Sequence, residues 1–271
     1  MRLVPRRDAR LGSGLSWLLL LALIALYFAV AEHRIALDPL DRRMPGFSQM
    51  LSAMADAAFT ADGEGRYRLW HDTAASLGSL VPALVISALI GLVIGIACGA
   101  QPLFAASLSP ALTAFSTIPA LALLPVLLIW HPASNPQLPL LVLGLTPLIA
   151  REIQQQTRAL GREQIDRAFT LGANGWTLVT RVILPQMLPR LLVALRIHLG
   201  VAWLLLIAGE ALSESPGLGQ RLFALRAEAA MALILPYLLW IALLVYAGDG
   251  LLRIAPSRLF PWFTHGARAA A

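Results

Sequence analysis

The sequence contains no lysine, so all 21 of its basic residues are arginine. A P-loop ATPase needs a lysine to reach the β- and γ-phosphates of its nucleotide, and a pyridoxal enzyme or a retinal protein needs one for its Schiff base. The chain therefore belongs to none of these classes. If ATP drives its activity, another polypeptide hydrolyses the nucleotide.

Charged residues and cysteine are scarce as well. Charged residues make up 13% of the chain and hydrophobic residues 58%, whereas a soluble domain carries about 25% charged residues. The single cysteine, Cys98, excludes an intrachain disulfide and lies in an apolar run, which favours packing over redox chemistry. The composition predicts a polytopic membrane protein, because a soluble domain of 271 residues could not bury so much apolar surface.

The net charge of +6 does not indicate a nucleic-acid partner. The arginines lie between apolar runs rather than on one basic face, so we expect no nucleic acid to bind. With the N-terminus placed in the cytoplasm, more arginines fall in cytoplasmic segments than in outer ones. This distribution agrees with the positive-inside rule.

Three long stretches lack Asp, Glu, Lys and Arg: residues 11–31, 73–150 and 229–248. A helix crosses the ~30 Å hydrocarbon layer in about 20 residues, so the second stretch is long enough for three spans, separated near Gln101-Pro102 and residues 131–136. The sequence predicts an all-α membrane protein with six transmembrane helices, near residues 15–31, 76–99, 108–130, 137–151, 188–209 and 230–251.

An even number of spans places both termini on one side of the membrane, here the cytoplasmic side. We expect a cytoplasmic N-terminal tail over residues 1–14, a transmembrane domain over 15–255 and a cytoplasmic C-terminal tail over 256–271. The first apolar stretch, which ends in Ala29-Val30-Ala31, also resembles a signal peptide with its cleavage site. We favour an uncleaved span, because the stretch is slightly too long for a signal peptide.

The charged segment at residues 152–187 differs from the rest of the chain. Its pattern predicts a short helix over 163–171, a relaxed backbone at Gly172 and Gly175, and a second short helix from Thr177 to Ile183. An ordinary surface loop on the bilayer is the alternative. The length of the segment favours a functional role, since long ordered loops usually carry function.

This segment resembles the cytoplasmic "EAA" loop of the permease subunits of bacterial binding-protein-dependent ABC importers. That loop reads Glu-Ala-Ala, three residues, Gly, nine residues, a β-branched residue, one residue and Leu-Pro. The corresponding residues here are Asp166-Arg167-Ala168, Gly172, Val182 and Leu184-Pro185. The spacing matches throughout, with Asp166 in place of Glu and Arg167 in place of the first Ala.

Further matches at residues 118–125, 171–176, 191–210 and 217–219 make the chain similar to the nitrate/sulfonate/taurine branch of these permeases. The resemblance implies a translocation pathway for a small solute: a sulfonate or taurine, nitrate or a small nitrogen compound. It implies as partners two ABC ATPase subunits, a periplasmic or tethered solute-binding protein and a second permease copy, most simply in a homodimer. The resemblance also implies that the chain lies in the bacterial inner membrane, in contact with its lipid.

The same resemblance implies that this chain is not an enzyme. ATP and Mg²⁺ would be held by the ATPase subunits, and we expect no cofactor, metal or catalytic residue here. Gly172 is expected to permit a tight turn behind the short helix, and Pro185 to end one helical piece before the next. The residues implied to couple transport to the ATPases are Asp166, Arg167, Ala168, Gly172, Ala173, Val182, Leu184 and Pro185.

Polar, ionisable and aromatic residues inside the expected spans are candidates for the pathway. For the hydroxyls the alternative is that they satisfy backbone groups freed by nearby prolines, and for Arg196 that it snorkels to the interface. Glu210 is expected at the outer end of its span, where it would meet the binding protein or close a gate. The pathway candidates are Thr113, Ser116, Thr117, Trp130, Arg196, Trp203 and Glu210.

Two local patterns predict packing rather than transport chemistry. Gly91, Gly95 and Gly99 repeat every fourth residue, which lets two helices approach closely. Asp249 and Arg253 are spaced to form an ion pair on one helix.

Two other functions remain as alternatives. An ion-coupled secondary transporter usually shows internal repeats and charged or broken helices at the midplane, and neither an internal repeat nor a carboxylate in residues 73–150 is found. An intramembrane enzyme would need a catalytic pair within the spans, and none is evident. The ABC importer permease is the favoured prediction.

Overall fold

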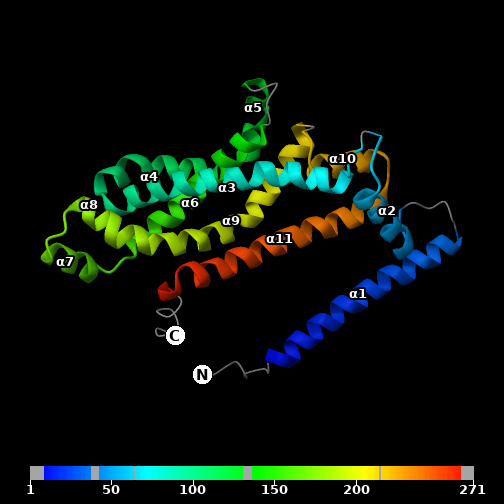
Figure 1. Cartoon of the computed structure of the whole chain (residues 1–271), viewed down its shortest axis with the longest axis horizontal. Coiled ribbons are helices and arrows are strands. Elements are labelled where there is room, and N and C mark those ends of the chain that lie inside the picture. Colours follow the sequence, from blue (N-terminus) through cyan, green and yellow to red (C-terminus); the bar gives the residue numbers. More distant parts are fainter. Residues whose placement is uncertain (1–8, 38–42, 64, 131–135, 214, 264–271) are drawn as a thin grey trace. The chain divides into compact units, whose positions relative to one another are not determined.

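The computed structural model describes residues 9–37, 43–63, 65–130, 136–213 and 215–263. Within these ranges the chain forms helices joined by short turns and no β-strand (Figure 1), which confirms the all-α prediction. The helices, in chain order, are α1 (Ala9–Leu37), α2 (Phe47–Phe59), α3 (Arg68–Ala100), α4 (Pro102–Thr117), η1 (Ala120–Leu123), α5 (Leu124–Trp130), α6 (Gln137–Arg158), α7 (Arg162–Thr170), α8 (Gly175–Leu178), η2 (Val179–Ile183), α9 (Leu184–Ser213), α10 (Leu218–Ala227) and α11 (Met231–Leu259).

The chain divides into two compact units. Unit 1 comprises Met1–Tyr67 and Ala224–Leu238, and unit 2 comprises Arg68–Phe223 and Leu239–Ala271. Within unit 1, the rings of Phe28 on α1 and Phe47 on α2 meet edge to face with their centroids 5.8 Å apart. All the sites described below lie in unit 2.

The core of unit 2 is the contact between α3 and α6. A Cβ atom added at Gly91 would lie 2.8 Å from the side chain of Ile149, and one at Gly95 would lie 2.6 Å from that of Ile153. Gly99 faces Thr157 in the same way. The prediction that these glycines form a packing face is confirmed, because any side chain there would keep the two helices apart.

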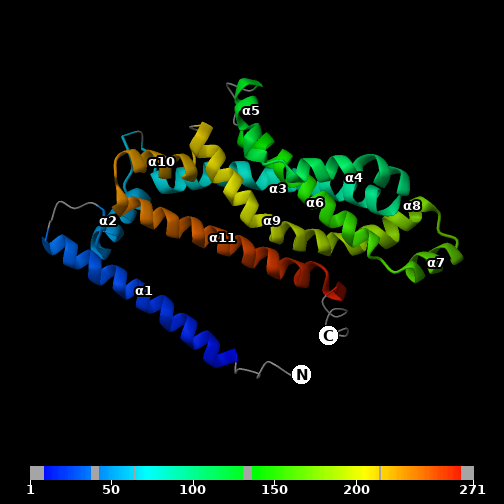
Figure 2. The same cartoon turned by 180° about the vertical axis from the view of Figure 1, so that it is seen from behind.

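These contacts also give the direction of the two helices. As the residue number rises along α3, the partner's number rises along α6, so α3 and α6 run parallel. The connection through α4, η1 and α5 must therefore bring the chain back from the end of α3 to the start of α6 (Figure 2).

This returning segment is bent within the expected span 108–130, which therefore stays a prediction as a span but is not one straight helix. The helix ends at Thr117, resumes at Ala120 and changes direction by 88° between the two parts. Ile118 has an extended backbone, with φ −73° and ψ 127°. Its neighbour Pro119 explains this conformation, because a proline ring disfavours the helical conformation of the residue before it.

The expected break at Pro185 is absent. Residues Gly175–Ser213 form one continuous helix through α8, η2 and α9, so Thr177 to Ile183 is not a separate short helix. The five residues of η2 form a π-helical turn, in which the Leu184 N–H donates to the Val179 carbonyl. Such a wide turn explains how Pro185, which lacks an N–H, fits into a continuing helix.

In the described part of the chain, three helical segments are long and apolar enough to cross a membrane: Arg68–Ala100, Gly175–Ser213 and Met231–Leu259. The bent pair Pro102–Thr117 and Ala120–Trp130 raises the number to four if it counts as one span. The expected spans 76–99, 188–209 and 230–251 lie inside the three long segments, 137–151 lies inside α6 and 15–31 inside α1. The count of six spans and the division into tails and membrane domain stay predictions.

Candidate coupling and transport sites

The segment with the EAA-like spacing carries a short exposed helix, α7. It runs from Arg162 to Thr170, within one residue of the predicted bounds, and none of its residues is buried. Figures 1 and 2 show it beside α8, at the opposite end of α9 from α10. Large apolar side chains in and around it are left uncovered: Phe169 is 50%, Leu171 88% and Trp176 76% exposed.

The turn that ends α7 depends on Gly172. Its φ is +82°, a conformation that costs other residues roughly 1–2 kcal/mol. The Gly172 N–H donates to the Phe169 carbonyl at 2.9 Å, and the Ala173 N–H donates to the Ala168 carbonyl at 3.0 Å. These two bonds form a Schellman motif, which satisfies carbonyls left open at a helix end. The predicted tight turn is confirmed.

The backbone on the far side of the turn is capped by Asn174. Its Oδ1 accepts hydrogen bonds from the Thr177 N–H and the Thr177 hydroxyl, both at 2.8 Å. Gly175 does not share the conformation of Gly172, because its φ is not positive. The expectation that both glycines relax the backbone therefore holds only for Gly172.

The predicted coupling residues lie on α7, in the Gly172 turn, and in η2 and the start of α9. The turn joins the group on α7 to the group in η2 and α9. Asp166 and Arg167 are exposed on α7, where the Arg167 guanidinium donates to Glu163 at 2.7 Å. Ala168, Gly172 and Ala173 form the turn, and the other predicted residues lie in η2 and the first turn of α9. These are Val182, Leu184 and Pro185. A long contact connects the groups: the Gln186 side chain donates to that of Gln164 at 3.5 Å.

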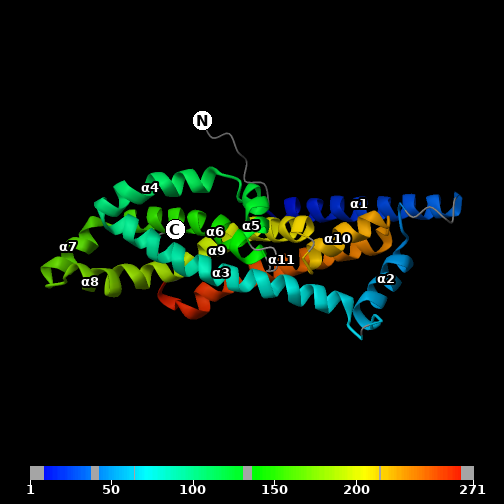
Figure 3. The ribbon, with the colours of Figure 1, turned by 90° about the horizontal axis from the view of Figure 1, so that it is seen from above.

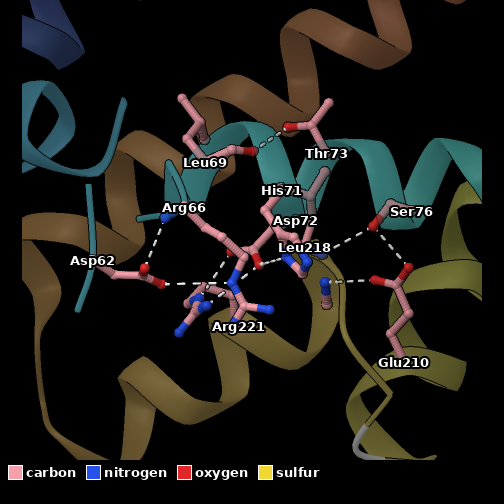
Figure 4. A network of polar contacts seen from close by, with 11 residues as sticks. Asp62, Arg66, Leu69, His71, Asp72, Thr73, Ser76, Glu210, Leu218 and Arg221 are labelled. Carbon is pink, nitrogen blue, oxygen red and sulfur yellow. Dashed lines mark hydrogen bonds and ion pairs between the residues drawn. The ribbon is translucent and has the colours of Figure 1, made fainter. Parts of the chain in front are cut away.

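A buried polar cluster lies near the other end of α9, around Glu210, which is 1% exposed. Its carboxylate accepts from the Ser76 hydroxyl at 2.7 Å and from the Gly219 N–H at 2.8 Å. The Ser76 oxygen in turn accepts from the Leu218 N–H at 2.9 Å (Figure 4). The carboxylate also lies against Gly217, where any side chain would overlap it. We call Ser76, Glu210, Gly217, Leu218 and Gly219 the Glu210 cluster.

A second buried carboxylate lies one turn before Ser76 on α3. Asp72 is 2% exposed, and its two oxygens accept from the Arg221 guanidinium of α10 at 2.8 and 3.3 Å. Next to it, Thr73 accepts a hydrogen bond from the Trp240 indole at 3.0 Å. The start of α3 is thus joined by polar contacts to α9, α10 and α11.

Polar contacts also join α4 to α6, which lie alongside each other (Figure 3). The Arg151 guanidinium donates to the Ser116 hydroxyl at 2.6 Å, and the Gln154 amide donates to the Ser109 hydroxyl at 2.6 Å. We call these four residues the α4–α6 polar seam. Sequence reasoning selected Ser116 but not Arg151, because no local pattern links positions 35 residues apart.

The remaining pathway candidates are not gathered in one place. Thr113, Thr117 and Trp130 are exposed, whereas Trp203 is 4% exposed and belongs to the core. Glu210 is 1% exposed, which does not fit the expected contact with a binding protein, whereas its other expected role, in a gate, stays a prediction.

Arg196 joins α9 to α11 by an ion pair. Its Nε lies 2.6 Å from Asp249 Oδ1, and the second Asp249 oxygen lies 2.9 Å from Arg253. The predicted pair of Asp249 and Arg253 is confirmed, while the contact of Asp249 with Arg196 was missed. Within the described ranges, no group of three or more His, Cys, Asp or Glu side chains could hold a metal ion.

Comparison with known proteins places these features in a family. Residues 91–261 match the family described as the binding-protein-dependent transport system inner membrane component. The chain belongs to this family. The matched region contains α7, the Gly172 turn, the polar seam and most of the Glu210 cluster.

Individual relatives agree with the family assignment. The taurine transport system permease protein TauC of Escherichia coli (strain K12) is 33% identical over 199 residues, which cover 73% of this chain and 72% of that protein. A putative aliphatic sulfonates transport permease protein, SsuC of Bacillus subtilis (strain 168), is 26% identical over 66% and 65% of the two chains. The bicarbonate transport system permease protein CmpB of Synechocystis sp. is 27% identical over 52% and 51%.

A solved structure supports the fold. A chain of the MetNI methionine ABC transporter in an inward-facing conformation is 22% identical, with a TM-score of 0.52, and the match covers 68% of this chain and 96% of that one. The chain is thus a membrane permease component of a binding-protein-dependent ABC importer, and the secondary transporter is not favoured.

Proposed function

We propose that the chain is one half of a homodimeric permease that carries a small solute with an oxyanion group. Three relatives are named for taurine, aliphatic sulfonates and bicarbonate. Taurine and the aliphatic sulfonates carry a sulfonate group, and bicarbonate is itself an oxyanion, so each bears a negatively charged cluster of oxygen atoms. A solute of this class is delivered by a periplasmic or tethered binding protein.

The observation that carries the coupling part of this proposal is α7 and its Gly172 turn. A helix without buried residues, next to uncovered Phe169, Leu171 and Trp176, presents an apolar surface suited to a partner protein. We assign that partner as an ABC ATPase subunit, which holds ATP and Mg²⁺. One ATPase subunit contacts each permease copy. The chain lies in the bacterial inner membrane, with both termini on the cytoplasmic side.

The continuous helix Gly175–Ser213 connects this surface to the membrane. It extends over about 58 Å at 1.5 Å per residue. When two ATPase subunits close on ATP, each displaces α7, and the displacement passes through α8 and η2 into α9. The pathway then opens outward, and after hydrolysis it opens inward.

Copurification from native membranes tests the coupling surface. Tagged chain is extracted in mild detergents, and the proteins that accompany it are identified by mass spectrometry. We expect a P-loop ATPase in stoichiometric amount with the wild-type chain and a large loss of it with Trp176→Ala. Trp262→Ala is the matched control, because Trp262 is also exposed, at 60%, but lies after α11.

Three results bear on the proposal. Loss of the ATPase with Trp176→Ala alone supports the surface formed by α7, its Gly172 turn and Trp176 on α8 as the ATPase-binding surface. Equal recovery with both variants contradicts that assignment. Recovery of the chain without any ATPase, across several mild detergents, contradicts the assembly itself.

A further inference from the structure

Arg151 lies within the apolar part of unit 2. Its neighbours on α6, Ile149 and Ile153, pack against Gly91 and Gly95 of α3. This level is five to nine residues before the end of α3 at Ala100, or roughly 8–14 Å of helix. Arg151 is the last residue of the expected span 137–151, and an ionisable side chain in a membrane-spanning segment is a functional candidate that faces a bundle interior or a water-filled cavity.

The Arg151 side chain is held in place by α4. Its Nη1 donates to Ser116 Oγ at 2.6 Å, while the Ser116 hydroxyl donates to the Thr113 carbonyl at 2.9 Å. The Ser116 hydroxyl thus donates to a carbonyl of its own helix and accepts from the Arg151 guanidinium. This arrangement fixes one corner of the guanidinium on the last turn of α4, directly before the 88° bend.

The charge of Arg151 has no counter-ion among the described residues. In the part of the chain that the structure describes, no carboxylate lies within 4.0 Å of it, whereas Arg196, Arg221 and Arg253 each have such a partner. A guanidinium has five N–H donors in a planar fork, and one of the five is used by Ser116. The half-buried side chain is therefore a cation with four donors left for a further acceptor.

We propose that Arg151, oriented by Ser116, binds the oxyanion group of the solute on its way through the membrane. The fork geometry of a guanidinium matches two oxygens of one anion, and such charge-assisted hydrogen bonds are the strong ones. The inference rests on the proposed function, because it requires a solute with an oxyanion group.

The seam contains a neighbouring contact that serves packing. Gln154 is 6% exposed and donates to Ser109 at 2.6 Å, so both groups are satisfied and neutral. A second uncharged pair at Arg151 would hold α4 to α6 equally well. A packing role alone does not explain why a charged side chain without a counter-ion stands at that position.

The test uses the complete importer, with both permease copies, the ATPase subunits and the binding protein, in proteoliposomes. The probes are labelled taurine, methanesulfonate and bicarbonate, and the two readouts are initial uptake and ATP hydrolysis. We expect Arg151→Gln to lower uptake at least about tenfold and to leave ATP hydrolysis within about twofold of wild type. Arg151→Lys retains more uptake than Arg151→Gln, because it keeps the charge but loses the fork.

Arg158→Gln is the matched control, because Arg158 lies two helical turns further along α6, is exposed and carries the same charge. It is expected to transport at the wild-type rate. Uptake by Arg151→Gln within about twofold of wild type, or a parallel loss of insertion, ATP hydrolysis and uptake, overturns the inference. A wild-type complex that hydrolyses ATP but imports none of the three probes overturns the proposed solute class and this inference with it.

Discussion

Glu210 and Glu163 each accept a hydrogen bond of 2.7 Å, Glu210 from the Ser76 hydroxyl and Glu163 from the Arg167 guanidinium. Their surroundings differ. Glu210 is buried and joins α9 to Ser76, 134 positions away on α3, and to Gly219 in α10, whereas Glu163 is 78% exposed and its partner lies four residues along the same helix. Hydrogen bonds of equal length therefore contribute differently to stability. The loss of a bond costs more free energy where it leaves a buried donor or acceptor without a partner.

Glu210 lies near the C-terminal end of α9, and Glu163 lies on α7, which precedes the N-terminal end of the same helix. The two ends of α9 are about 45 Å apart. At one end the Glu210 cluster holds α3, α9 and the start of α10 together through buried contacts. At the other end α7 is held by bonds within its own segment and by one long contact to Gln186. We interpret the end of α9 near Glu210 as fixed to the rest of unit 2. We interpret α7, at the other end, as a surface that a partner protein contacts.

The largest expected effect is that of removing the buried carboxylate. Glu210→Ala leaves the Gly219 N–H without its acceptor and the Ser76 hydroxyl without its own, so it should lower the free energy of unfolding by about 2–4 kcal/mol. Glu163→Ala should change it by less than about 1 kcal/mol. Denaturant unfolding of both variants in detergent micelles checks the comparison, and equal effects would contradict it.

Next in size is the coupling energy of two ion pairs, measured by double-mutant cycles. Asp72, 2% exposed, and Arg221, 31% exposed, form a partly buried pair with two contacts, for which we expect roughly 2 kcal/mol. Glu163 and Arg167 form an exposed pair on α7, for which we expect about 0.3–0.5 kcal/mol. The cycles use Asp72→Asn with Arg221→Gln and Glu163→Gln with Arg167→Gln. A larger value for the exposed pair would invalidate the distinction between the two ends.

Gly172→Val is expected to affect function more than stability. The new side chain cannot adopt φ +82° without strain, so the turn behind α7 should change while the Glu210 cluster keeps the rest of unit 2 in place. The variant should insert normally and hydrolyse ATP without transport in proteoliposomes. Gly175→Val is the matched control, because Gly175 has no positive φ and nothing lies near its Cβ position. Unchanged coupled transport by Gly172→Val would remove Gly172 from the coupling role.

Features set by local sequence could be predicted well. The bounds of α7 follow from its own pattern, the turn at Gly172 follows from the residue's freedom at positive φ, and the glycine face of α3 follows from its four-residue repeat. Each of these depends on a few neighbouring residues. The same holds for the pair of Asp249 and Arg253 on one helical face.

Features that depend on distant partners could not be predicted. Glu210 was expected at the outer end of its span, as a contact of the binding protein or part of a gate, but its partner Ser76, 134 positions away, makes it part of a buried cluster. Arg151 was missed because its partner Ser116 lies on another helix. Proline was ambiguous even locally: Pro119 breaks its helix, whereas Pro185 is absorbed by the π-helical turn before it.

Cross-linking at α7 tests most directly whether an ATPase subunit binds this helix. Because Cys98 is the single cysteine, a Cys98→Ala background lets one introduced thiol be attached to a short bifunctional reagent. Leu171→Cys is the probe, since Leu171 is 88% exposed at the end of α7, and Leu212→Cys, 59% exposed near the far end of α9, is the control. We predict a cross-link to an ATPase subunit from position 171 and none from position 212. Absence of the cross-link at 171 in a complex that still hydrolyses ATP, or equal cross-linking at both positions, would contradict this prediction.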